Sequence, residues 1–269
     1  MDSADSGLVD SLFINLPLVR GIESKFNVQN ARKWMGDNFY IAWTGALVYL
    51  ALVFIGRKWM INRPRYELKK ALFAWNVGLA VFSFIGCISM LPNLVHSIIR
   101  NGFSHTTCKT DVFTSNPGII LWGFLFCLSK LAELVDTVFI VLRKSKLSFL
   151  HWYHHASVLI FAYYTFGRPI ESALEHYYSS INFTVHSIMY TYYALRAADV
   201  RLSSKIAQVI TVLQISQMFI CMIATTLAYV NYSGGADCNL DFGVLYAALA
   251  LYGSYALLFI QFFVGRYLF

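Results

Sequence analysis

Three histidines stand close together at the start of an apolar stretch of the chain. The segment 151–155 reads HWYHH, and apolar residues continue through Phe166. In a helix, the spacing i, i+3, i+4 brings all three imidazoles to one face. Imidazole groups are costly to place against lipid, so we expect this face to point toward the protein interior or a cavity. The spacing therefore indicates a polar site inside an apolar helix.

Three other apolar stretches also carry polar residues at helical spacing. The first is a stripe that advances in steps of three, the second is a face with the spacing i, i+4, i+8, i+11, and the third again advances in steps of three. In chain order these sets are Lys130, Glu133 and Asp136 with Thr137 beside them; Asn182, His186, Tyr190 and Tyr193; and Thr211, Gln214 and Gln217.

Each of these sets also has a structural interpretation. Lys130 and Glu133 are suited to an ion pair that locks two helices together, since charged groups in a membrane need partners. The glutamines are suited to hydrogen bonds between helices, and the tyrosines to aromatic packing with satisfied hydroxyls. A single buried histidine is also more often structural than catalytic. Three histidines on one helix face and a fourth on the next helix favour chemistry.

Two kinds of chemistry fit this cluster. Imidazole is the commonest metal ligand, so a metal-dependent membrane oxidase or hydroxylase is one alternative. A di-iron site built from several histidine boxes needs more than the four candidates His151, His154, His155 and His186, whereas a mononuclear site stays open. The other kind is covalent catalysis, in which a neutral imidazole nitrogen accepts an acyl group from a thioester. The acyl-imidazole is labile, so such a site must exclude water.

The composition shows what positions these residues. The chain of 269 residues is 58% hydrophobic and only 13% charged, which excludes an ordinary soluble globular domain. The long apolar runs predict an all-α polytopic membrane protein with a polar tail over residues 1–38 and one seven-helix domain over residues 39–269. The tail has a short amphipathic helix near residues 31–35. The expected spans are 39–55, 72–94, 117–142, 149–166, 173–195, 206–230 and 242–263.

The basic residues predict the orientation of these spans. The net charge of +7 comes largely from short loops, mainly 57–70, 142–148 and 196–205, so it does not indicate a nucleic-acid partner. The positive-inside rule then places the C-terminus in the cytosol and the N-terminus in the lumen. Cys108 and Cys238 fall in loops on the lumenal side, where thiols oxidise, and we expect a disulfide between them. Two unpaired loop cysteines are the alternative.

Four motifs together resemble one family of enzymes. They are KxxExxDT at 130–137, HxxHH at 151–155, HxxMYxYY at 186–193 and TxxQxxQ at 211–217. In this order, each on its own predicted span, they resemble the ELO family of very-long-chain fatty acid elongases. The resemblance covers essentially all seven predicted spans.

The resemblance implies a 3-ketoacyl-CoA synthase of the endoplasmic reticulum membrane. Such an enzyme condenses a long-chain acyl-CoA with malonyl-CoA and releases CO2 and CoA, with no cofactor beyond these two substrates. The family fold has seven helices, six of which form a barrel around an acyl tunnel that opens to the cytosol. The implied partners are the bilayer and the reductases and dehydratase of the elongation cycle, and a homodimer is an open alternative. A non-enzymatic seven-helix lipid receptor or carrier remains the contrasting interpretation.

The resemblance also implies roles for the polar residues. His154 is the expected acyl-accepting nucleophile, and His151 and His155 orient it or move protons. His186 assists the decarboxylation of malonyl-CoA or stabilises the resulting enolate. The expected substrate-binding set, with no metal ligand, is Lys130, Glu133, Asp136, Asn182, Tyr190, Tyr193, Gln214 and Gln217. Arg143, Lys144 and Arg201 are candidates for contact with CoA phosphates, although the positive-inside rule alone also explains them.

The residues of the histidine box narrow the part of the ELO family that the chain resembles. The segment LHWYHH at 150–155 and the segment YYALRAA at 192–198 resemble elongases of saturated and monounsaturated acyl-CoA near sixteen carbons. Polyunsaturated elongases typically carry a glutamine five residues before the first histidine, where this chain has Lys146. Branched acyl substrates remain an alternative. Family members usually continue into a basic tail with a retention signal, whereas this sequence stops at Phe269.

Overall fold

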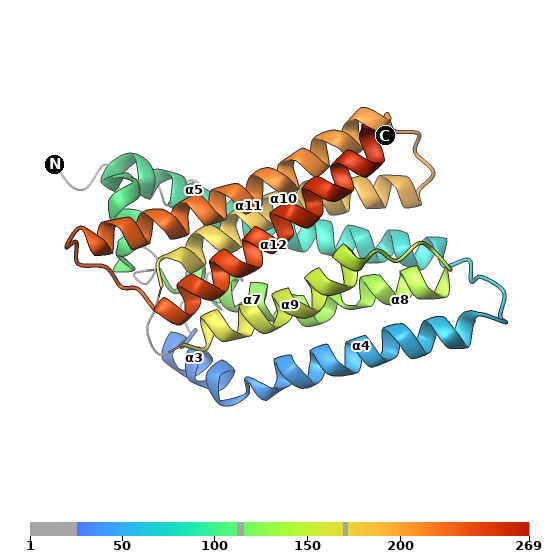
Figure 1. Ribbon diagram of the computed structural model, residues 1–269, viewed down its shortest axis with the longest axis horizontal. Coiled ribbons are helices and arrows are strands. Elements are labelled where there is room, and N and C mark those ends of the chain that lie inside the picture. Colours follow the sequence, from blue (N-terminus) through green and yellow to red (C-terminus); the bar gives the residue numbers. More distant parts are fainter. Residues whose placement is uncertain (1–25, 112–115, 169–171, 269) are drawn as a thin grey trace.

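The computed structural model describes residues 26–111, 116–168 and 172–268, and all regular elements in these ranges are helices. Figure 1 shows the helices running side by side along the long axis of the molecule. In chain order they are α3 (Val28–Asp37), α4 (Tyr40–Met60), α5 (Lys69–Cys108), α7 (Pro117–Glu133), α8 (Val135–Leu142), α9 (Phe149–Phe166), α10 (Leu174–Ala197), α11 (Ser204–Ser233) and α12 (Phe242–Tyr267).

Four of the described helices, α4, α5, α11 and α12, are long and apolar enough to cross a membrane. The chain is therefore an all-α, multi-pass membrane protein, as the composition predicts. Every predicted span falls on a helix. The helices that carry the motifs at 130–137, 151–155 and 186–193, however, are not among those long and apolar enough to cross a membrane. α7 has 17 residues and α8 has eight, and α9 and α10 contain the histidines. The count of seven spans stays a prediction.

The helices pack around two apolar cores, and α5, α9 and α10 contribute residues to both. α4 lies at the edge of the bundle and packs along α8 and α9, while α5 runs along α10 and α11 runs along α12. One apolar core joins α3, α4, α7 and α9 around Met35, Leu159 and Tyr163. A second core joins α9 to α10, α11 and α12 around Tyr178 and Tyr252.

One predicted span boundary is wrong, and one predicted span is interrupted. Cys108 is not in a loop, because α5 continues beyond the predicted span and ends at this residue. The extension bends at Gly102, whose φ of 79° is a backbone conformation that glycine adopts without steric cost. The predicted span 117–142 is divided between α7 and α8 at Leu134. This break lies inside the stripe of polar residues.

The predicted disulfide between Cys108 and Cys238 is confirmed. It ties the end of α5 to the connection between α11 and α12. The Asn239 N–H donates to the Cys108 carbonyl oxygen at 2.8 Å, and Lys109 pairs with Asp237 beside the bond. These contacts bring distant parts of the chain together at one end of the bundle.

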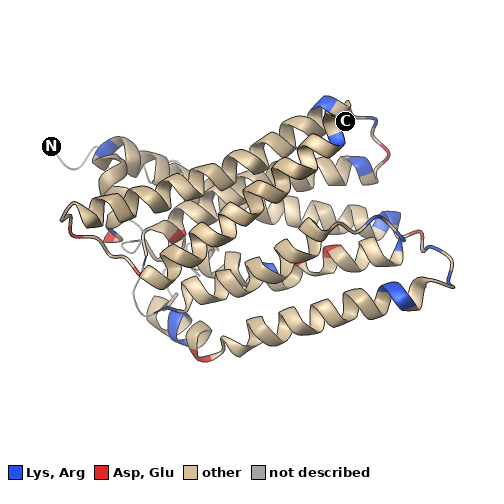
Figure 2. Ribbon diagram, viewed as in Figure 1, with Lys and Arg blue, Asp and Glu red and all other residues tan. Residues whose placement is uncertain are grey.

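Basic residues gather at the opposite end (Figure 2). There the Tyr66 N–H donates to the Leu142 carbonyl at 3.0 Å, and Lys144 Nζ donates to the Ile61 carbonyl at 3.0 Å. Lys69 pairs with Asp199 across the same end. The three basic loops that the topology prediction groups together therefore lie together.

The short helix α3 covers the ends of α9 and α10 at the disulfide end of the bundle. The expected helix near residues 31–35 is confirmed, within a longer element that begins after the N-cap Asn27. Arg32 donates to the Phe166 carbonyl at 3.0 Å and to Glu175 Oε2 at 2.9 Å, and both charged side chains are buried. This ion pair fixes α3 against the bundle.

Asp241 joins two helices at the same end. Its Oδ1 accepts from the Val244 N–H at 3.1 Å and so caps α12, while its Oδ2 accepts from Arg168 Nε at 2.6 Å. Burial alone raises the pKa of the Asp241 carboxyl. The hydrogen bonds from Arg168 and Val244 outweigh burial and hold the pKa below its usual value.

We expect Asp241→Asn to destabilise the protein near neutral pH and to have less effect in acid. Because the folded-state pKa is depressed, the carboxylate stabilises the fold above its unfolded-state pKa of about 3.9, and this contribution is lost as the pH falls through the folded-state pKa. Thermal unfolding in detergent at about pH 7 and about pH 3 measures the effect. Asp237→Asn, in the neighbouring loop, is the exposed control. A destabilisation by Asp241→Asn that is equal at both pH values contradicts the expectation.

Candidate active site

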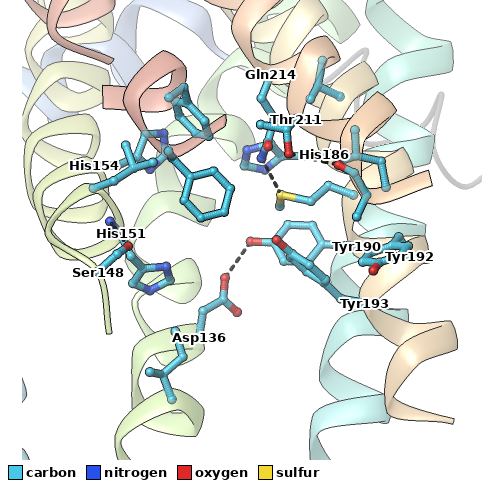
Figure 3. A pocket seen from close by; sticks show the side chains of 18 of the residues that line it. Asp136, Ser148, His151, His154, His186, Tyr190, Tyr192, Tyr193, Thr211 and Gln214 are labelled. Atoms are coloured by element: carbon cyan, nitrogen blue, oxygen red, sulfur yellow. Dashed lines mark hydrogen bonds between the residues drawn. The ribbon is translucent and has the colours of Figure 1, made fainter. Parts of the chain in front are cut away.

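One cavity of about 700 Å³ brings the polar motifs together. It lies among α5, α8, α9, α10, α11 and α12, and Figure 3 shows side chains from several of these helices pointing into it. The predicted site residues that line it are Asp136, His151, His154, His155, Asn182, His186, Tyr190, Tyr193, Gln214 and Gln217. Lys130 and Glu133 are not among its lining residues.

The histidine box begins in the first turn of α9. Ser148 caps this helix, since its Oγ accepts from the His151 N–H at 3.2 Å. The His151 and His155 rings lie 4.3 Å apart, and the His154 ring packs 4.7 Å from the Tyr255 ring. Within the described residues, no protein group hydrogen-bonds a ring nitrogen of His154. The imidazole of His154 is therefore free to contact a substrate in the cavity that it lines.

His186 stands across the cavity from His154 (Figure 3). It is buried on α10, one turn after Asn182. Its Nδ1 lies 3.9 Å from Glu133 Oε2, an oxygen with no hydrogen-bond partner among the described residues. A protonated His186 would therefore have a carboxylate close behind it.

A buried ion pair lies behind the cavity wall. Lys130 Nζ donates to Glu133 Oε1 at 2.7 Å and to Asn182 Oδ1 at 3.1 Å, and Ser129 Oγ donates to the same Glu133 oxygen at 2.9 Å. The Lys130 and Glu133 side chains are only 2% and 5% exposed. The contacts of this pair are therefore structural. Two of its neighbours, Asn182 and His186, line the cavity and connect the pair to it.

Asp136 links three helices at the cavity wall. Its Oδ1 accepts from Trp75 Nε1 at 2.6 Å, and its Oδ2 accepts from the Tyr190 hydroxyl at 2.7 Å. The break at Leu134 precedes it. There the Leu134 N–H donates to the Leu131 carbonyl and the Thr137 N–H donates to the Leu134 carbonyl, which is the tighter i to i+3 pattern. The tightened turn changes the direction of the residues that follow Glu133.

The remaining predicted residues occupy the other side of the cavity. Gln214 Nε2 donates to Met189 Sδ at 3.2 Å, a weak acceptor that a substrate oxygen could replace. Gln217 is buried on the same helix. Tyr190 is buried, whereas Tyr193 is 43% exposed. Among the described residues, no three His, Cys, Asp or Glu side chains are grouped so that they could hold a metal ion.

Comparison with known proteins identifies the family of this chain. The family model of ELO, described as the GNS1/SUR4 family, matches residues 34–269. The chain belongs to the ELO family. It is 36% identical to human very long chain fatty acid elongase 6 over 246 residues, which cover 91% of each chain. It is 37% identical to the Drosophila melanogaster protein of the same name over 256 residues, which cover 94% of this chain and 80% of the relative.

A relative from Caenorhabditis elegans is similarly close to this ELO-family chain. It is named long chain fatty acid elongase 1 and is 39% identical over 238 residues, which cover 88% of this chain and 81% of the relative. The matches therefore span nearly the whole length of the described helices.

The structure also places basic residues that the sequence prediction missed. Of the three basic residues predicted to contact CoA phosphates, Arg143 lines the cavity, whereas Lys144 and Arg201 are not among the lining residues. Lys144 instead donates to the Ile61 carbonyl. Arg196 and Arg266 line the cavity in their place, each in the last turn of its helix. Arg196 lies inside the segment YYALRAA at 192–198, so the resemblance of this segment to elongases could have pointed to it.

Trp75 was missed because nothing local distinguishes it. It is one aromatic residue in the long apolar run of α5, and only the fold brings its indole to Asp136. A second void of about 30 Å³ lies deeper in the bundle, where Phe126, Phe161 and Tyr252 are among its lining residues.

We expect Asp136→Asn to reduce the stability of the fold. An amide offers one acceptor oxygen, so either Trp75 or Tyr190 loses its acceptor and faces an NH2 group instead. A buried donor without a partner costs about 1–3 kcal/mol of unfolding free energy. Thermal unfolding in detergent measures this loss, with the exposed Asp111→Asn as the control, for which the change should stay within about 0.5 kcal/mol. Equal effects of the two substitutions would contradict the assignment.

Proposed function

We propose that this protein is a fatty acid elongase that condenses a long-chain acyl-CoA with malonyl-CoA. The products are a 3-ketoacyl-CoA two carbons longer, CO2 and CoA. The observation that carries the proposal is that the histidine box of α9 and His186 of α10 face one cavity inside a membrane bundle of the ELO family. Its elongase relatives support the same reaction class.

In the first step His154 accepts the acyl group. A ring nitrogen attacks the thioester carbonyl carbon, the carbon–sulfur bond breaks, and CoA leaves as a thiol after it takes up the proton from the imidazole. The free ring nitrogens of His154 and its place on the cavity wall support this role. His151 and His155, on the same wall, orient the reacting groups or move the proton.

In the second step malonyl-CoA loses CO2, and the resulting enolate carbon attacks the acyl-imidazole. The new carbon–carbon bond forms as the bond to His154 breaks, and the departing ring nitrogen takes up one proton from solvent, which replaces the proton lost to CoA and regenerates the neutral imidazole. His186 lies across the cavity from His154, where it can stabilise the enolate oxygen. The unpartnered oxygen of Glu133, 3.9 Å from His186 Nδ1, supports a charged imidazole during this step.

The CoA portions of both substrates bind at the basic end of the cavity. Phosphate groups favour arginine because its guanidinium donates several hydrogen bonds in a fixed geometry. Arg143, Arg196 and Arg266 line the cavity at the end where the basic loops lie. We place this end and the C-terminus in the cytosol, and the N-terminus in the lumen of the endoplasmic reticulum.

The acyl chain extends from the histidines toward the disulfide end of the bundle. In the arrangement proposed, seven helices span the membrane and six of them surround an acyl tunnel, with α4 outside. The position of α4 at the edge and the void beside Phe161 and Tyr252 support it. The residues of the histidine box, LHWYHH at 150–155, favour saturated or monounsaturated acyl chains near sixteen carbons. The reductases and dehydratase that complete elongation are the proposed partners, and no cofactor is required.

We expect His154→Ala to abolish condensation and acyl-enzyme formation. Loss of a covalent nucleophile lowers turnover by about a thousandfold or more. Two measurements on the purified protein check this: incorporation of malonyl carbon into a longer acyl-CoA, and the intact mass after incubation with acyl-CoA alone. His105→Ala is the control and should behave as the wild type, because His105 is a partly exposed histidine that pairs with Asp111 and does not line the cavity.

Different results would favour other functions. An acylated protein in which the added mass maps to another residue overturns the assignment of His154. Stoichiometric iron in the active protein favours a metal-dependent oxidase. Binding of acyl-CoA with neither acylation nor turnover favours a lipid receptor or carrier.

A further inference from the structure

A chain of hydrogen bonds connects the edge helix α4 to the histidine box. The Tyr49 hydroxyl lies 2.9 Å from Thr137 Oγ1, and Thr137 Oγ1 lies 2.9 Å from His151 Nε2. Tyr49 and Thr137 are 5% and 1% exposed. Tyr49 is not among the residues that line the cavity, whereas His151 is. A helix outside the proposed barrel is therefore connected to a cavity-lining histidine through two buried hydroxyls, those of Tyr49 and Thr137.

Thr137 uses its hydroxyl differently from most helical threonines in this protein. Such hydroxyls usually donate to a carbonyl three or four residues earlier in their own helix. That bond is present at Thr44, Thr165, Thr184, Thr191, Thr211 and Thr225. The Thr137 hydroxyl has no such bond, and its hydrogen-bond partners are Tyr49 and His151. Its proton is therefore available to one of these two groups.

Counting protons fixes the direction of the chain. Tyr49 has one hydroxyl proton, and Thr137 Oγ1 is its hydrogen-bond partner among the described residues. If Tyr49 donates to Thr137 and Thr137 donates to His151 Nε2, both hydroxyl protons have acceptors. If His151 Nε2 carried the proton instead, either the Tyr49 or the Thr137 proton would be buried without an acceptor, which is costly. The geometry thus favours Nε2 as acceptor and a proton on Nδ1.

The Nδ1–H of His151 is then the group left for a substrate. Among the described residues, no protein atom hydrogen-bonds Nδ1, and His151 lines the cavity on the same helix face as His154. When His154 attacks the thioester, negative charge develops on the carbonyl oxygen. An N–H donor that is already oriented stabilises that charge without reorganisation.

We propose that Tyr49 is a positioning residue that, through Thr137, fixes His151 as an Nδ1–H donor to the carbonyl oxygen of the substrate thioester. The inference rests on the proposed elongase function, and it assigns His151 the donor role in acylation. Tyr49 itself touches no reacting atom. No covalent bond or net proton transfer is added to the reaction by this role.

The test compares rates of acyl-enzyme formation in the purified full-length protein with palmitoyl-CoA alone as the probe. We expect Tyr49→Phe to slow acylation about tenfold, because the buried hydrogen bond that orients the Thr137 hydroxyl toward His151 is lost, with KM for acyl-CoA unchanged. Tyr177→Phe is the matched control, because it removes an equally buried tyrosine–threonine hydroxyl contact, 2.6 Å from Tyr177 to Thr106, that lies away from both cavities. It should acylate at the wild-type rate.

Substitutions at Thr137 separate a relay from a packing effect. Thr137→Val breaks the chain at nearly constant volume, and Thr137→Ser should restore the rate that valine loses. The double variant Tyr49→Phe/Thr137→Val should be no slower than Thr137→Val, because both act through one chain. Nitrogen chemical shifts of His151 should show the proton on Nδ1 in the wild type and a mixture of tautomers in Tyr49→Phe. If Tyr49→Phe fails to fold, the valine–serine comparison and the His151 shifts decide.

Each remaining outcome overturns a definite statement. A wild-type rate for Tyr49→Phe, or losses that multiply in the double variant, overturns the relay. A wild-type His151 protonated on Nε2 does the same. If the wild type forms no acyl-enzyme, the proposed function itself fails, and this result is distinct from a relay failure in an enzyme that does acylate.

Discussion

The high cost of unpaired polar groups in a membrane constrains this structure more than any other factor. Lys130 and Glu133 satisfy that constraint by pairing at 2.7 Å, and the pair then extends to Asn182. Asp136 satisfies it with Trp75 and Tyr190. The Lys130–Glu133 pair lies within α7, whereas the bonds to Asn182, Trp75 and Tyr190 join helices that are distant in sequence. The polar residues needed for chemistry therefore also specify how α5, α7, α8 and α10 pack.

The same constraint explains how much the sequence could predict. Because polar residues inside apolar runs are rare, the helical spacing within each motif already indicated which faces turn inward. The cavity is lined by the four histidines of the motifs, and by Asn182, Gln214 and Gln217. The roles of Lys130 and Glu133 differ from expectation in one respect, since their pair lies behind the cavity wall. The spacing indicated on which helix face Lys130 and Glu133 lie, but it could not indicate whether they line the cavity or lie behind its wall.

Other features were beyond the reach of local pattern. The break at Leu134 has no proline or glycine to mark it, and the turn of Thr137 toward His151 depends on that break. Trp75 and Tyr49 are each one of several aromatic residues in an apolar helix. Tryptophan and tyrosine are as common in contact with lipid as in buried hydrogen bonds, so the residue type does not distinguish the two. The extension of α5 to Cys108 was missed because residues 95–108 have the polar composition of a loop, although a bend at Gly102 lets the helix resume.

The disulfide gives the site a further property. Cys108 and Cys238 are separated by 130 residues, and every motif residue from Lys130 to Gln217 lies between them. Closing a loop of this size restricts the unfolded chain, an effect worth about 4–5 kcal/mol in the chain-entropy model. A single cut of the backbone in the 142–148 loop would also leave both pieces covalently joined. The reacting groups thus belong to one closed ring of polypeptide, and a nicked molecule keeps them together for as long as this bond stays oxidised.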